Sequence, residues 1–218
     1  MTFFAPLAHP PGLLRRLYPE AVWRMHGSSK SVYLTFDDGP IPVVTPWILE
    51  KLDEARAKAT FFCVGENVFR YPLIYNDILT HGHAAGNHTY NHLQGLKTNN
   101  EEFYQNIDEA AQLIHSNLFR PPHGFLSLTQ YRRISEKYKI IMWDILSRDY
   151  IPSSKPAKIL QTISHYLQNG SVITFHDSVK TFDILQKTLP TVIKMLKDEG
   201  YMLDAIPFYT KEKLLLHT

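Results

Sequence analysis

Two adjacent carboxylates, Asp37 and Asp38, follow the apolar run 31–36 and stand directly before Gly39 and Pro40. Glycine and proline end a strand, so this pattern places the pair on a loop at the carboxyl end of a strand, where parallel α/β proteins build their sites. Asp, Gly and Pro are also common turn residues. An ordinary turn is therefore the alternative that the local pattern leaves open.

A second polar cluster has the spacing of metal ligands. His88 and His92 are four residues apart, which predicts that both imidazoles lie on one face of a helical turn. The chain has eleven histidines, so a chance pair of surface histidines is the competing interpretation. Two histidines with one aspartate leave an open coordination position on zinc or a related divalent ion, which suits a site that activates water.

These clusters need a scaffold, and the chain predicts alternating strands and helices. The expected strands are 31–36, 59–64, 82–88, 119–124, 139–143, 171–175 and 201–205, and the expected helices are 45–55, 72–79, 98–117, 129–137, 156–167 and 182–199. Such alternation requires a mostly parallel sheet, open or closed. Polar clusters follow five of the strands, and we expect only a closed sheet to bring so many strand ends together, which favours a barrel.

Two capping signals mark expected helix starts. Thr45 is placed to cap the helix 45–55, with Pro46 at its first position. Thr98 and Glu101 fit a capping box at the start of the helix 98–117.

Composition indicates one domain and removes several classes of partner. The 218 residues are 44% hydrophobic and 20% charged, which is enough for a sizeable core. The formal charge is +2 and the basic residues are dispersed, so we expect no nucleic acid or anionic lipid as a partner. The single cysteine, Cys63, excludes an internal disulfide and lies in an apolar run, as a buried inert thiol does.

The amino-terminal segment, residues 1–28, carries four prolines and is expected to form an arm packed on the domain. Its first eight residues lack the basic start of a signal peptide, and no apolar run approaches the roughly 20 residues that span a bilayer. We therefore expect a cytoplasmic protein without a membrane span. An extracellular or periplasmic location would require a missing leader or unconventional export.

Five motifs, in sequence order, resemble those of the polysaccharide deacetylases, carbohydrate esterase family four with its NodB-homology domain. They are Thr35-Phe-Asp-Asp-Gly-Pro40, His88-x-x-x-His92, Arg120-x-Pro-x-Gly124, Asp149-Tyr150 and His176-Asp177. The first two motifs are highly specific, and the match runs from about residue 31 to 205. The resemblance implies that residues 29–218 form the catalytic domain, a distorted (β/α) barrel of about seven parallel strands, TIM-barrel-like, with a metal-dependent deacetylase site at its carboxyl-end face.

The resemblance also implies roles for the first two motifs. It makes Asp38, His88 and His92 the ligands of one divalent metal ion, with Zn²⁺ expected first and Co²⁺, Ni²⁺ or Mn²⁺ as alternatives. It makes Asp37 the general base, which Arg120 keeps ionised and directed. An amide carbonyl is a poor electrophile, so this chemistry needs both a metal that polarises it and a base that deprotonates water.

The later motifs supply the remaining expected groups. The backbone N–H of His123 stands at the family's oxyanion position, and His176 is the candidate acid for the leaving amine, with Asp149 favouring its imidazolium form. The expected substrate-binding residues are Tyr90, Pro122, Trp143, Tyr150 and Thr174.

Four positions depart from the family pattern. His123 replaces the usual Tyr, Leu146 stands where an Asp often begins the fourth motif, Tyr150 replaces Trp, and Thr174 replaces a Leu that often lines the acetyl-methyl pocket. None of these changes removes a ligand, base or acid. They concern the pocket wall and rim, which select the substrate.

The leading interpretation is a metal-dependent N-deacetylase, a hydrolase of C–N bonds other than peptide bonds. Its partner would be an acetylated carbohydrate with N-acetylglucosamine-type units, such as a glycan, a chitooligosaccharide or a peptidoglycan fragment. The closest alternative is an O-acetyl esterase, for example on acetylated xylan. A catalytically silent carbohydrate-binding relative is the alternative from another class.

Overall fold

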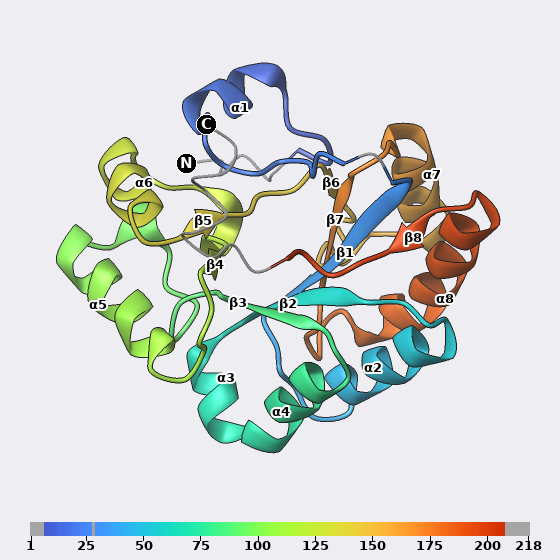
Figure 1. The fold of residues 1–218 in the computed structure, drawn as a ribbon, viewed down its shortest axis with the longest axis horizontal. Helices are drawn as coiled ribbons and strands as arrows, with labels where there is room; N and C mark the ends of the chain where they lie inside the picture. Colours follow the sequence, from blue (N-terminus) through green and yellow to red (C-terminus); the bar gives the residue numbers. More distant parts are fainter. Residues whose placement is uncertain (1–6, 28, 208–218) are drawn as a thin grey trace.

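The computed structural model describes residues 7–27 and 29–207, so expectations about residues 1–6, 28 and 208–218 lie outside its described part. One parallel sheet curls into a half-barrel with helices around it (Figure 1). Its strands are β1 (Ser31–Asp37), β2 (Ala59–Cys63), β3 (Ala84–Asn87), β4 (Leu118–Phe119), β5 (Lys139–Ile140), β6 (Ile145–Leu146), β7 (Val172–His176) and β8 (Met202–Leu203). The predicted α/β architecture of about seven parallel strands is confirmed.

The strands follow the order β5-β4-β3-β2-β1-β7-β6, and β8 pairs with the beginning of β1. The two ends of this order, β5 and β6, are not joined by a ladder in the described chain. The sheet is therefore curled rather than fully closed, and its curvature is sufficient to bring the ends of β1, β3 and β7 to one pocket. β1 is an interior strand, between β2 and β7.

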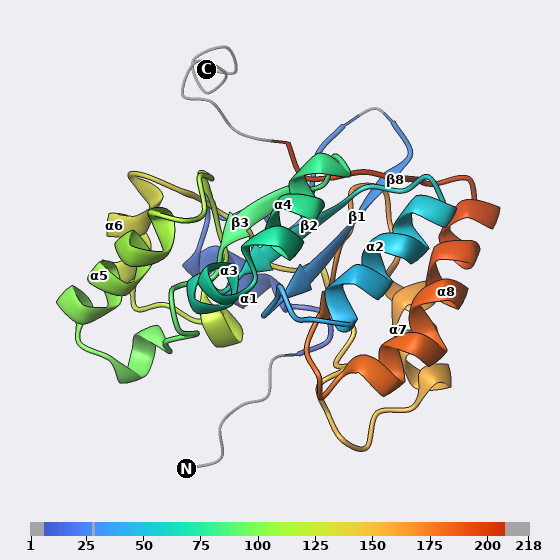
Figure 2. The ribbon, with the colours of Figure 1, turned by 90° about the horizontal axis from the view of Figure 1, so that it is seen from below.

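Eight α-helices of the described chain surround the sheet. They are α1 (Gly12–Leu17), α2 (Val44–Glu54), α3 (Gly65–Arg70), α4 (Pro72–Thr80), α5 (Asn100–Ala111), α6 (Leu128–Ser135), α7 (Pro156–Tyr166) and α8 (Phe182–Asp198). Two 3₁₀ turns, η1 (Gly95–Lys97) and η2 (Pro122–Gly124), complete the elements. Both ribbon views show α2, α7 and α8 together at one end of the molecule and α5 and α6 at the other (Figures 1 and 2).

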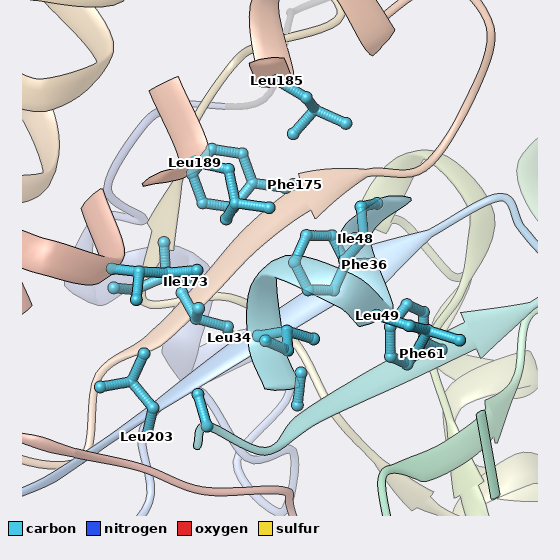
Figure 3. Packing of buried hydrophobic residues seen from close by; sticks show 14 of the residues in the cluster. Leu34, Phe36, Ile48, Leu49, Phe61, Ile173, Phe175, Leu185, Leu189 and Leu203 are labelled. Atoms are coloured by element: carbon cyan, nitrogen blue, oxygen red, sulfur yellow. The ribbon is translucent and has the colours of Figure 1, made fainter. Parts of the chain in front are cut away.

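The largest core cluster lies between the central strands and the helices α2, α7 and α8. Three stacked aromatic rings mark its centre (Figure 3): the ring of Phe36 lies 5.1 Å from that of Phe61 and 6.1 Å from that of Phe175. Leu185 and Leu189 of α8 are completely buried in the same cluster. β1 is buried on both faces, which explains the apolar run in its sequence.

Both predicted caps are wrong by one residue or more. α2 begins at Val44 after an N-cap at Val43, and Thr45 lies inside its first turn. The Thr45 hydroxyl accepts a hydrogen bond from the N–H of Ile41 and donates one to Asp177, so a tertiary contact uses the group that was expected to cap. At α5 the N-cap is Asn99, and the helix ends at Ala111 rather than near residue 117.

The amino-terminal arm fills part of the gap between the sheet ends. Val22 forms a parallel bridge with Ile141, and Arg24 forms an antiparallel bridge with Ser171. Trp23 lies between these bridges and is only 6% exposed. The described part of the arm therefore contributes to the sheet and to the core.

A fully buried carboxylate, Asp144, holds this arm. It accepts a hydrogen bond from the Nη2 of Arg15 at 2.7 Å, from the Nε of Arg24 at 3.2 Å, and from the hydroxyl of Ser171 at 2.7 Å. Two cations and a hydroxyl compensate for the burial of this charge, as a buried carboxylate requires.

Candidate active site

One pocket gathers the chemistry at the carboxyl ends of the strands. All but three of the predicted site residues line this pocket. The lining residues that were predicted are Asp37, Asp38, His88, His92, Arg120, His123, Trp143, Tyr150, Thr174 and His176. Asp149 lies behind His176, while Tyr90 and Pro122 are not among the lining residues. The pocket therefore unites residues separated by more than a hundred positions in the chain.

Asp38, His88 and His92 form a candidate metal centre. Their ligand atoms all lie within 4.8 Å of one another. Oδ1 of Asp38 is 3.3 Å from Nε2 of His92 and 3.8 Å from Nε2 of His88. That Oδ1 is buried without a hydrogen-bond partner, which is the state expected of an oxygen that coordinates a cation.

The protonation of His88 fits this use. Its Nδ1 lies 2.7 Å from the backbone carbonyl oxygen of Arg120, which can only accept, so Nδ1 carries the proton and Nε2 presents its lone pair. Burial lowers the pKa of His88 well below its usual value, with the charge of His92 adding to the effect, and keeps the ring neutral. The residues present therefore fit a divalent ion with N and O ligands.

The two histidines meet across a loop, so the expectation of a helical turn is wrong. β3 ends at Asn87, and both Thr89 and His92 have left-handed backbones, with φ of 66° and 60°. The Asn87 side chain accepts from the N–H of Thr89 at 2.8 Å, and the Thr89 hydroxyl accepts from the N–H of Leu93 at 3.0 Å. These bonds shape a loop that brings the two imidazole centroids to 5.1 Å.

Asp37 is fixed by an arginine that is itself fixed. Nη1 of Arg120 donates to Oδ1 of Asp37 at 2.6 Å and to the Thr35 hydroxyl at 2.7 Å. Its Nε and Nη2 donate to the carbonyls of Ile141 and Met142 at 3.1 and 2.9 Å. Burial raises the pKa of Asp37, while the guanidinium opposes that rise and favours the carboxylate. The result is an oriented carboxylate with more basic character than an exposed one.

His176 and Asp149 form a second hydrogen-bonded pair across the pocket. Nδ1 of His176 lies 2.8 Å from Oδ1 of Asp149, whose Oδ2 accepts from the His176 backbone N–H at 2.8 Å. Burial disfavours the imidazolium, but the Asp149 carboxylate, assisted by Asp38 and Asp37, outweighs it and raises the pKa of His176 to about 10. The ring can therefore hold a proton for donation at neutral pH.

Replacing Asp149 with Asn is expected to move the basic limb of the pH–rate profile to lower pH. An acid is active below its pKa, and without the carboxylate that raises it the pKa of His176 falls toward the value that burial favours. The limb should move by more than one pH unit, an order-of-magnitude expectation for a lost partner. Profiles of kcat for both proteins measure this shift, with the acidic limb as an internal control. An unmoved basic limb would contradict the pairing.

The pocket wall is built from closely packed elements. His123 has a left-handed backbone with φ of 62°, and its ring centroid lies 4.9 Å from that of His92. A Cβ at Gly124, where φ is 76°, would lie 2.3 Å from Cζ3 of Trp143. Trp143 is 3% exposed, so it forms a packed wall, whereas Tyr150 is 36% exposed at the rim. Backbone strain at non-glycine residues is typical of functional sites.

Two expected substrate-binding residues have other surroundings. Tyr90 packs against the main core, and its Cδ2 would be 2.8 Å from a Cβ at Gly65. Pro122 is buried, and the neighbouring Pro121 lines the pocket instead. A sequence motif fixes which residues are near the pocket, but side-chain direction depends on the local backbone.

Other pocket residues were not predicted from the sequence as binding residues. Ser178 and Lys180 line the pocket directly after the fifth motif, and position relative to that motif is the signal that could have found them. Asp177 stabilises the first motif, because its carboxylate accepts hydrogen bonds from the N–H of Gly39 at 2.9 Å and from the Thr45 hydroxyl at 2.7 Å.

A second group, Asp53, His81 and His83, also brings three ligand atoms within 4.8 Å. Nδ1 of His83 accepts the N–H of Ala59 at 3.2 Å, and burial lowers the pKa of His83 to about 4, so the ring is neutral with its proton on Nε2. A nitrogen that carries a proton cannot coordinate. His83 therefore offers no free ring nitrogen to a metal ion, and Asp53 and His81 alone do not make a three-ligand site.

Comparison with known proteins decides the family. A family model described as polysaccharide deacetylase matches residues 24–142. The chain belongs to the polysaccharide deacetylase family. The family prediction is thereby confirmed, as is the prediction that the chain is a carbohydrate deacetylase and hence a hydrolase.

Named relatives of this deacetylase come from bacteria. A peptidoglycan-N-acetylglucosamine deacetylase of Bacillus cereus is 29% identical over 82% of this chain and 87% of the relative. A chitooligosaccharide deacetylase of Azorhizobium caulinodans is 34% identical over 71% of this chain and 77% of the relative. The crystal structure of the Bc1960 peptidoglycan N-acetylglucosamine deacetylase superposes with a TM-score of 0.82 at 29% identity, covering 91% and 95% of the two chains.

Two further expectations concern a membrane span and the location of the protein in the cell. Within residues 7–27 and 29–207, this deacetylase has no helix with the length and apolar character to cross a bilayer. The expectation of a cytoplasmic location depends on the first residues, of which 1–6 lie outside the described part. That expectation stays a prediction.

Proposed function

We propose that this deacetylase hydrolyses the N-acetyl group of N-acetylglucosamine-type sugars and releases acetate. The substrate would be a glycan, a chitooligosaccharide or a peptidoglycan fragment, and the names of two relatives contain peptidoglycan and chitooligosaccharide. One divalent ion, Zn²⁺ first among the candidates, would be held by Asp38, His88 and His92. The observation that carries the proposal is that a buried Asp37–Arg120 pair and a His176–Asp149 pair share one pocket with these ligands.

Each group has a defined task in amide hydrolysis. A bound divalent ion supplies Lewis-acid polarisation of the acetyl carbonyl and lowers the pKa of water. Asp37, held by Arg120, takes a proton from the water as its oxygen forms a bond to the acetyl carbon. The N–H of His123 donates to the carbonyl oxygen as that oxygen becomes negative. His176 gives a proton to the amide nitrogen as the C–N bond breaks, so the products are acetate and the free amino sugar.

The acid favours an amide over an ester as substrate. An alkoxide is a better leaving group than an amide anion, so an O-acetyl esterase depends less on a proton donor. Here His176 is held by two hydrogen bonds to Asp149, with a pKa raised to about 10. The complete set of ligands, base and acid also argues against a catalytically silent carbohydrate-binding protein.

Acetate release from a panel of substrates tests this proposal. We expect the chelated protein to be inactive and Zn²⁺ to restore release from chitooligosaccharides or peptidoglycan fragments, with acetyl-xylan the poorer substrate. The loss on chelation should be at least about 100-fold, because removing the metal removes several kcal/mol of charge stabilisation. Preference for acetyl-xylan would favour the esterase. Unchanged release after chelation would defeat the metal-dependent mechanism.

A further inference from the structure

The loop that follows β7 presents a cation to the pocket. Lys180 is exposed and lines the same pocket as the candidate metal ligands. The pocket's other Lys or Arg side chain, among the described residues, is Arg120, which is 2% exposed and donates to Asp37 and three other groups. Of the lysine and arginine side chains that line this pocket in the described chain, Lys180 is thus the one that remains available to a ligand.

Several other lysines of the described chain have acidic partners. On α8, Lys187 pairs with Asp183 at 2.8 Å and Lys194 pairs with Asp198 at 2.6 Å. Within the described residues, Lys180 has no such ion pair. Apart from Asp37 and Asp38, no acidic side chain of the described chain lines the pocket. An anion that approaches Lys180 therefore meets an ammonium group that no carboxylate of the described chain already pairs with.

The backbone that carries Lys180 is anchored at both ends. Asp177 accepts from the N–H of Gly39, beside the first motif. Thr181 is fully buried, and its hydroxyl bonds to the His176 carbonyl and accepts the N–H of Ser178 at 3.3 Å. These contacts hold the loop to the groups expected to act on the substrate. A charge on such a fixed loop discriminates between ligands better than one on a mobile segment, because less ordering is required on binding.

We propose that Lys180 forms an anion subsite at the rim of the pocket, which binds a carboxylate carried by the glycan and selects acidic over neutral N-acetylated glycans. The lactyl carboxylate of N-acetylmuramic acid, a sugar that alternates with N-acetylglucosamine in peptidoglycan, has the required chemistry. The inference rests on the proposed function and narrows its substrate class. Charge pairing of this kind contributes mainly to selectivity and to substrate capture.

A matched pair of substrates tests the subsite. The probes are a peptidoglycan tetrasaccharide with free muramic carboxylates and the same tetrasaccharide with these carboxylates as methyl esters. For the Zn²⁺-loaded protein, kcat/KM should be higher on the free acid. In Lys180→Gln the ratio of kcat/KM, free acid over ester, should fall about fivefold, which corresponds to one partly exposed ion pair. The change should lie in KM and shrink at high salt.

Three further variants sharpen the experiment. Lys180→Arg should retain the ratio and Lys180→Glu should invert the preference. The control Lys194→Gln, at a lysine that pairs with Asp198 and does not line the pocket, should leave both the ratio and the activity unchanged. A merely structural role of Lys180 would change both substrates alike and would not be restored by Arg. An unchanged ratio in both Lys180→Gln and Lys180→Glu would overturn the subsite.

Binding measurements separate this inference from the proposed function. Dissociation constants for the two tetrasaccharides, measured calorimetrically on the Zn²⁺-loaded protein, should show the same dependence on Lys180 without turnover. A wild-type protein that prefers the free acid but releases no acetate would overturn the proposed function and support the subsite. Equal affinity of the wild type for free acid and ester would overturn the subsite, whatever the turnover.

Discussion

Replacing Asp37 with Asn is expected to lower kcat on an N-acetylated substrate by about 100- to 10,000-fold, the usual contribution of a general base. The amide has nearly the shape of the carboxylate but cannot take a proton from water. The candidate metal ligands are Asp38, His88 and His92, so metal content should stay near that of the wild type. Acetate release and metal content, both measured on purified protein, check the two halves of this expectation.

A matched variant at the neighbouring position provides the control. Asp38→Asn removes a ligand oxygen, so it should lose metal as well as activity. Asp37→Asn also leaves the guanidinium of Arg120, which is 2% exposed, without its carboxylate, so the thermal unfolding of each variant must be followed beside its activity. If folded, metal-loaded Asp37→Asn turned over at the wild-type rate, the assignment of Asp37 as the base would be wrong.

The largest expected effect on stability is at Asp144. Its carboxylate is completely buried and accepts hydrogen bonds from Arg15, Arg24 and Ser171. Asp144→Ala should lower the free energy of unfolding by about 3 kcal/mol, the lower end for breaking a buried pair, because both arginines are partly exposed and can reach water. Urea denaturation measures this loss.

An exposed ion pair provides the comparison for this variant. Asp198 pairs with Lys194 at 2.6 Å on α8 with both side chains largely exposed, so Asp198→Ala should change stability only marginally. Equal stability of Asp144→Ala and the wild type would show that the arm docks without this carboxylate. Asp144 follows Trp143, whose Nε1 donates to the carbonyl of Leu7 at 3.1 Å, so release of the arm should also loosen the pocket wall.

The local sequence was sufficient to predict an element when the residues of that element alone specify it. The apolar run before Asp37 predicted β1 because every residue of that strand but one is buried. Gly39 and Pro40 predicted where that strand ends, since neither residue extends a strand comfortably. The family motifs likewise indicated most pocket residues, because the carboxyl ends of parallel strands lie at one edge of a sheet.

Local signals failed where a distant residue competes for the same group. Thr45 has the composition of a cap, but Asp177 takes its hydroxyl and the helix begins earlier. The spacing of His88 and His92 is helical, yet hydrogen bonds within the loop and a left-handed backbone bring the rings together instead. Both outcomes depend on interactions whose partners no local window contains.

The sequence by itself determined the alternating elements, the family and the identities of the expected ligands, base and acid. Only the tertiary structure decided how far the sheet closes, that the amino-terminal arm enters its gap, and that Tyr90 faces the core while Lys180 faces the pocket. The physical reason is that periodicity and turn chemistry act over a few residues. Side-chain direction and charge pairing are instead set by packing between segments far apart in the chain.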